Sequence, residues 1–109
     1  MDALIDKLLP LSEATYYILL ALREPAHGYA IMQQLEAISE GAVKIGPGTL
    51  YGAFSNLEKQ GLIEMVREAE RRKVYAMTDL GRHVLLAQLR RLRVMVRVGD
   101  ADAPFLSTY

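Results

Sequence analysis

The sequence predicts a mainly α-helical domain that carries one two-stranded β-hairpin. Its 109 residues suit a single small domain that can bury a modest core. Helix-starting and helix-ending residues bound four segments in which apolar residues recur at helical spacing. Two runs rich in β-favouring residues stand between the third and fourth of these segments. The expected order is therefore three helices, a hairpin and a last helix.

The first two helices are bounded by local signals. Ser12 stands in a helix-starting position, and Pro25 follows a segment that ends at Arg23. Apolar residues on nearly every side of this segment predict a largely buried helix. The second helix should begin at Gly28 and end before Gly41, because glycine readily adopts the left-handed backbone conformation that ends a helix. Its apolar residues repeat at helical spacing, at Ile31, Leu35 and Ile38.

The third helix lies within GPGTLYGAFSNLEKQGL, residues 46–62, where three glycines and a proline stand near a helix start. Pro47 suits the first helical position, so Gly46 becomes the cap. Gly61 supplies a left-handed residue at the end, where Leu62 should contact Leu57. Apolar residues share one side of the helix, at Leu50, Ala53, Phe54 and Leu57. Small, polar and basic residues share the other side, at Gly48, Gly52, Ser55, Asn56 and Lys59.

A hairpin and a fourth helix follow. Residues 63–69 and 72–78 are rich in β-favouring side chains, and a short polar connection joins them. This connection lacks glycine, which leaves the type of turn open. Thr78 and Asp79 then open a helix that should reach about Val98 and measure about 30 Å, with the acidic side chain near the positive end of the helix dipole.

This order of elements predicts a winged helix-turn-helix, in which the third helix enters the major groove of DNA and the hairpin contacts phosphates. We expect residues 1–78 to form the winged-helix domain together with an N-terminal helical extension. Residues 79–98 should form a long C-terminal dimerisation helix. Residues 99–109 have no helical pattern and should be a flexible tail.

Composition argues against several classes of protein. The chain has no cysteine and only two histidines, His27 and His83, so we expect neither a disulfide framework nor a zinc cluster, and no cofactor. The absence of cysteine fits a reducing cytoplasm, where we expect the protein to act. The longest apolar run, residues 16–22, is far shorter than the ~20 residues of a membrane span, so we expect no membrane partner. The glycine-rich stretch lacks the GlyLys of a Walker loop, and no catalytic set is present, which argues against an enzyme.

Charge is unevenly distributed although the net charge is zero. Residues 1–41 contain two basic and six acidic residues, a net charge of −4, so the remainder carries +4. Basic side chains cluster at residues 71–73 and again among Arg90, Arg91, Arg93 and Arg97. Such local patches suit contact with nucleic acid despite the neutral total.

Four fragments in this order resemble the PadR family of bacterial transcriptional regulators: HGY at 27–29, GTLY at 48–51, LEKQGLI at 57–63 and MTDLG at 77–81. The resemblance implies a homodimeric winged-helix repressor of the short subfamily, whose single helix after the wing helps to form the dimer. It also implies control by a small aromatic or cytotoxic effector. Two features differ: many relatives have proline where this chain has Gly52, and many have a glycine in the wing.

Nine residues are the candidate DNA contacts: Gly48, Thr49, Tyr51, Ser55, Asn56, Lys59, Arg71, Arg72 and Lys73. The Asn56 amide can both donate and accept, which suits a base edge, whereas Lys59 suits a phosphate. Tyr51 is either a core residue with its hydroxyl at the surface or a phosphate donor, and the resemblance favours the phosphate contact. The alternative for the helix residues is a solvated face without a partner. The alternative for residues 71–73 is a turn that only increases solubility. His27 is interpreted as a structural residue at a turn.

Six apolar residues are the candidate dimer contacts: Leu4, Leu8, Leu85, Leu89, Leu92 and Val96. The last four form a narrow stripe of the kind found in coiled coils. The N-terminal segment should pack on the partner's long helix, or alternatively cover its own core. A two-fold dimer would favour a pseudo-palindromic DNA operator. The competing function is a winged-helix protein-protein interaction module, which would show no salt-dependent retention on duplex DNA.

Overall fold

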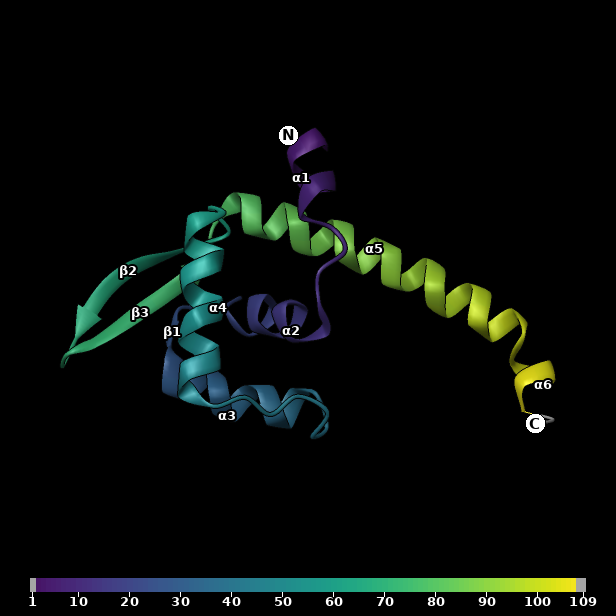
Figure 1. The fold of residues 1–109 in the computed structure, drawn as a ribbon, viewed down its shortest axis with the longest axis horizontal. Helices are drawn as coiled ribbons and strands as arrows, with labels where there is room; N and C mark the ends of the chain where they lie inside the picture. Colours follow the sequence, from purple (N-terminus) through teal and green to yellow (C-terminus); the bar gives the residue numbers. More distant parts are fainter. Residues whose placement is uncertain (1, 108–109) are drawn as a thin grey trace.

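The structure is a computed structural model that describes residues 2–107. Its elements are α1 (Asp2–Leu8), α2 (Glu13–Ala21), β1 (Ala26–His27), α3 (Gly28–Ile38), α4 (Pro47–Lys59), β2 (Ile63–Ala69), β3 (Arg72–Met77), α5 (Asp79–Ala101) and α6 (Ala103–Leu106). Helices α2, α3 and α4 lie beside the sheet, and α5 runs past them and projects away (Figure 1). This arrangement confirms the predicted winged helix-turn-helix with a long C-terminal helix.

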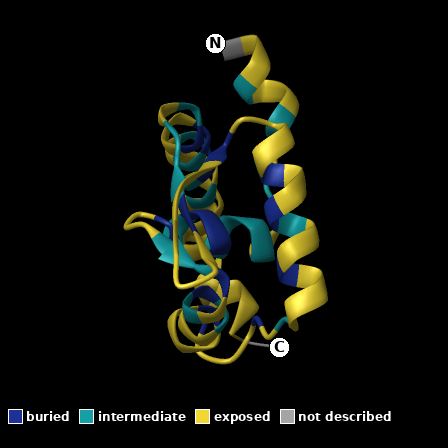
Figure 2. Ribbon diagram, turned by 90° about the vertical axis from the view of Figure 1, so that its left-hand side faces the viewer, coloured by how far each residue is buried: buried dark blue, intermediate teal, exposed yellow. Residues whose placement is uncertain are grey.

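One hydrophobic core joins the helices to the hairpin. Helix α4 contributes Leu50, Phe54 and Leu57, which are almost completely buried. The rest of the buried cluster comprises Ile18, Leu19, Ala21, Leu22, Ile31, Leu35, Leu62, Ile63, Tyr75 and Val84. Buried residues lie on the inner sides of the elements, and most of the outer surface is exposed (Figure 2). Because such short helices are marginal in isolation, this shared burial stabilises them.

Both predicted ends of α4 are confirmed. Gly46 is the N-cap and Pro47 occupies the first helical turn. At the other end Gly61 has a left-handed φ of +77°. The Leu62 N–H donates to the Leu57 carbonyl at 2.9 Å, which closes the Schellman arrangement expected there.

The caps of the other helices follow the same local signals. The Ser12 side chain accepts the N–H of Thr15 at 3.1 Å and begins α2. Gly41 after α3 has a left-handed φ of +83°. The Thr78 hydroxyl accepts the N–H of Gly81 at 3.0 Å and begins α5. These helix boundaries are therefore properties of the local sequence.

The hairpin turn consists of Glu70 and Arg71. Their φ angles of 51° and 66° are both left-handed, as a two-residue turn of type I′ requires. Ala69 and Arg72 pair directly on either side of the turn. The turn therefore adopts the twist that suits a hairpin without the glycine that usually provides it, and its tip carries the guanidinium of Arg71.

The sheet contains a third strand that the sequence did not predict. In strand order β1-β3-β2, the two-residue strand β1 pairs Ala26 with Tyr75 and His27 with Val74. A strand of two residues is too short to show an alternating pattern. Its effect is to attach the start of α3 to the hairpin.

The expected tail was wrong in part. Helix α5 continues beyond Val98 to Ala101, and the four-residue helix α6 follows where no helix was expected. Adding residues to a helix that has already nucleated costs little, and Pro104 suits the first turn of α6. The flexibility of residues 99–107 stays a prediction, and residues 108–109 lie outside the described part of the chain.

The N-terminal segment packs against the chain's own core. Ile5, Leu8 and Leu9 are half-buried there, whereas Leu4 is 47% exposed. The first half of α5 joins the same core, since Val84 is fully buried. The division of the chain at residue 78 into a winged-helix domain and a dimerisation helix stays a prediction. Among residues 2–107, no helix is both long and apolar enough to cross a membrane.

Candidate nucleic-acid interface

The outward side of α4 is exposed along its whole length. At about 100° per residue, Gly48, Gly52, Ser55 and Lys59 follow its midline. Thr49 and Asn56 lie on one flank, and Tyr51 and Glu58 lie on the flank that faces the hairpin. These eight residues are all exposed, opposite the buried side chains of the core. The predicted division of α4 into a core side and a small, polar side is therefore confirmed.

The glycines of this face are not required by packing within the chain. A Cβ atom added to Gly48 or Gly52 would meet no atom within 4 Å, and neither residue has a positive φ. Gly28 differs, because a Cβ there would lie 2.8 Å from the hydroxyl of Tyr51. Open glycines inside a helix lower its stability and leave room for another molecule to approach the backbone.

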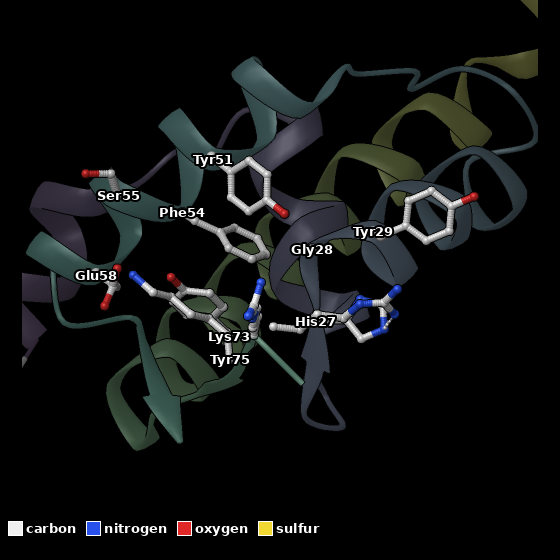
Figure 3. Close-up of a pocket in the computed structure, with 11 residues that line it drawn as sticks. His27, Gly28, Tyr29, Tyr51, Phe54, Ser55, Glu58, Lys73 and Tyr75 are labelled. Carbon is white, nitrogen blue, oxygen red and sulfur yellow. Dashed lines mark hydrogen bonds between the residues drawn. The ribbon is translucent and has the colours of Figure 1, made fainter. Parts of the chain in front are cut away.

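A groove of about 620 Å³ separates α4 from the hairpin. It is lined by His27, Gly28, Tyr29, Tyr51, Phe54, Ser55, Glu58, Arg71, Arg72, Lys73 and Tyr75 (Figure 3). Of the nine predicted DNA contacts, the structure brings five to this groove: Tyr51, Ser55, Arg71, Arg72 and Lys73. The other four, Gly48, Thr49, Asn56 and Lys59, remain on the exposed part of α4 outside it.

His27 connects the start of α3 to the hairpin. Its Nδ1 accepts the N–H of Ala30 at 3.4 Å, so the side chain caps α3. Its Nε2 lies 3.4 Å from Nη1 of Arg72. This agrees with the interpretation of His27 as a structural residue, and the second contact holds Arg72 beside the groove.

Tyr51 lies at the border of the apolar side of α4, and its contact with phosphate stays a prediction. Its ring meets that of Phe54 edge to face, with centroids 6.2 Å apart. The close approach to Gly28 places its hydroxyl over the first turn of α3. The residue is nevertheless 51% exposed. Tyr51 is thus a boundary residue with its hydroxyl at the surface of the groove.

Tyr75 was missed by the sequence analysis. Its ring packs edge to face against Phe54, with centroids 4.8 Å apart, and only 7% of the residue is exposed. Burial raises the pKa of the phenol above its usual value of 10.0, with smaller contributions from the charges of Glu58 and Tyr51. The hydroxyl therefore keeps its proton near neutral pH and can donate a hydrogen bond.

The groove is lined by three cationic side chains and one carboxylate, that of Glu58. This balance favours an anionic occupant. Among residues 2–107 there is no group of three or more histidine, cysteine or acidic residues that could hold a metal ion.

Comparison with known proteins identifies the family. Residues 5–87 match the transcriptional regulator PadR-like family. The chain belongs to that family. A PadR family transcriptional regulator from Eggerthella lenta has the same fold, with a TM-score of 0.65 and 30% identity over 98% of this chain and 88% of the relative. RosR from H. salinarum gives a TM-score of 0.66 with 27% identity over 89% of this chain and 98% of RosR.

Two curated relatives of this PadR-like chain are much longer proteins. An uncharacterized 37.1 kDa protein in transposon Tn4556 of Streptomyces fradiae is 34% identical over 95 residues, which are 85% of this chain and 27% of that protein. The transcriptional regulator YqjI of Escherichia coli is 30% identical over 59 residues, which are 54% of this chain and 28% of YqjI. The chain therefore spans little more than a quarter of either relative.

Proposed function

We propose that this protein is a sequence-specific DNA-binding transcriptional regulator that acts as a homodimeric repressor. The observation that carries the proposal is the pair of open glycines, Gly48 and Gly52, on the exposed face of α4. Helix α4 enters the major groove, where the Asn56 amide reads a base edge and Lys59 contacts a phosphate. Because the family consists of transcriptional regulators, this use of α4 is also the one that membership supports.

The cations of the hairpin add attraction that does not depend on sequence. Arg71 lies at the tip of the turn, Arg72 and Lys73 begin β3, and all three line the groove beside α4. All three are exposed. Contacts of this kind between cations and the DNA backbone position a protein and make its affinity depend strongly on salt.

A second copy of the chain covers the projecting part of α5. Leu89 and Leu92 are half-buried, whereas Met95 and Val96 are 65% and 60% exposed. An apolar surface of this kind on a helix that leaves its own core supports an interface between two copies. Leu85 packs mainly against its own core. The two-fold dimer presents two copies of α4 to a pseudo-palindromic operator, about one helical turn apart.

An effector site near this interface is supported by a groove of about 430 Å³ between α2 and α5. Its wall includes Tyr16, Tyr17 and Met95, side chains that suit a planar aromatic or cytotoxic compound. Binding there releases DNA by changing the geometry of the dimer. A thermal-shift screen followed by DNA-release measurements tests this step, and compounds that bind without releasing DNA would contradict it.

The experiment for the proposed function is salt-dependent retention of genomic DNA fragments on the purified protein, followed by sequencing of the retained fragments. We expect enrichment of a pseudo-palindromic sequence and loss of retention in the triple alanine variant of Thr49, Asn56 and Lys59. Equal retention by the variant would refute the role of α4. No salt-dependent retention at all would favour the protein-protein interaction module instead.

A further inference from the structure

Tyr75 is a buried residue with an unused polar group that opens onto the groove between α4 and the hairpin. It is 93% buried by packing against Phe54, yet it lines the groove. Within residues 2–107 its hydroxyl has no hydrogen-bond partner, and no such unpartnered side-chain atom is fully enclosed, so solvent reaches the hydroxyl from the groove. Water is then its only partner, and the hydroxyl is free to donate a hydrogen bond to a molecule that enters the groove.

The neighbours of Tyr75 define the chemistry of that partner. Lys73 lies two residues away on the same strand and lines the same groove (Figure 3). Arg72 is placed beside the groove by its contact with His27. Phosphate oxygens accept hydrogen bonds from hydroxyl, ammonium and guanidinium groups, and such charge-assisted bonds are the stronger ones.

In the proposed complex, a phosphate of the DNA backbone reaches the groove between α4 and the hairpin. When α4 lies in a major groove about 12 Å wide, the sugar–phosphate strand that borders it must pass along one flank of the helix. The flank that carries Tyr51 and Glu58 faces the groove and the hairpin. With a volume of about 620 Å³, the groove is large enough for a phosphodiester.

We propose that the groove between α4 and the hairpin holds one backbone phosphate of the operator, and that the Tyr75 hydroxyl donates a hydrogen bond to it. The proposal rests on the proposed function and adds a residue that fixes the position of the DNA strand. Glu58 acts in the opposite direction, because its carboxylate repels the phosphate and weakens binding to every sequence.

Two variants test the site with opposite expected signs. Tyr75→Phe keeps the ring in the core and should weaken DNA binding about tenfold, with no change in the salt dependence because no charge is removed. Glu58→Gln, at an exposed position, should strengthen binding, and the gain should shrink as salt is added. Thr15→Val removes a hydroxyl outside the groove and serves as a control; because this hydroxyl accepts a hydrogen bond from Ser12 at the start of α2, the thermal stability of the variant is measured alongside.

A single neutral methylphosphonate, moved along the tightest-binding duplex, identifies the phosphate. One position should weaken wild-type binding strongly and Tyr75→Phe binding much less. Equal losses for both proteins at every position, or unchanged affinity in Tyr75→Phe and Glu58→Gln, would refute the site while leaving DNA binding by α4 intact. Absence of salt-dependent DNA retention by the wild-type protein would refute both the function and the site.

Discussion

Replacing Gly52 by alanine should make the protein more stable and less able to bind DNA. Gly52 lies in the interior of α4, has no positive φ, and offers open space to a Cβ atom. Alanine is therefore favoured over glycine by about 1 kcal/mol at this position. For a domain of this size, that gain raises the midpoint of thermal unfolding by about 4–8 °C.

The same methyl group opposes DNA binding because it projects from the midline of the face that enters the major groove. Where α4 approaches base edges closely, the methyl group must displace the helix or the DNA, and we expect a loss of about 1–3 kcal/mol in binding free energy. Thermal unfolding and DNA titration of the same preparation measure the two effects together.

Gly99→Ala is a control for the gain in stability alone, since Gly99 also lies in a helix with open space around its missing Cβ, on the part of α5 assigned to the dimer. It should raise stability by less than Gly52→Ala, because it lies in the last turn. A Gly52→Ala variant that is stabilised and binds DNA with wild-type affinity would refute the close approach of α4. A variant that is not stabilised would contradict the described geometry of the helix.

The polar side chains of α4, the phenol of Tyr75 and the apolar stripe of α5 can each be tested by substitution. Lys59→Ala should weaken binding to all sequences and lower the dependence of log affinity on log salt concentration by about one. Asn56→Ala should relax the preference for one base position at a cost of about 1–3 kcal/mol. The reverse pattern in DNA titrations would exchange the roles of the two residues. The pKa of Tyr75 is raised in the folded state, so the unfolded state loses its proton first and the free energy of unfolding should fall as pH rises above 10.0. Tyr75→Phe should reduce this fall in denaturant titrations, and an identical fall would contradict the pKa shift. The double variant Leu89→Glu and Leu92→Glu should sediment as a monomer or unfold and lose tight DNA binding, because charges would enter the apolar dimer interface. A wild-type monomer at micromolar concentration that retains sequence-specific binding would refute the dimer.

The parts of the fold that the sequence predicted are those determined by short-range chemistry. Gly61 and Thr78 identified helix ends because a left-handed glycine and a capping hydroxyl act within one turn of their own position. The core side of α4 followed from the spacing of Leu50, Phe54 and Leu57, since burial of one helix face requires that spacing. The fold class needed no more than these signals and the hairpin pattern.

The parts that the sequence did not predict depend on contacts between distant residues. Strand β1 exists because Ala26 and His27 meet β3, about fifty residues later, and nothing local to them indicates a strand. Within β3, Tyr75 looked like an ordinary β-favouring aromatic residue. Only the packing of β3 against α4 shows that its ring belongs to the core while its hydroxyl opens onto the groove.

The candidate site illustrates the same distinction within one helix. Spacing correctly separated the core side of α4 from its outer side, but it could not divide the outer side between two tasks. The hairpin makes that division, because it stands beside the flank of Tyr51 and Glu58 and leaves the flank of Asn56 free. Base reading by Asn56 and backbone contact by Tyr75 would then act on opposite flanks of α4. Loss of either contact should leave the other measurable, since residues that do not touch each other usually contribute almost independently to binding.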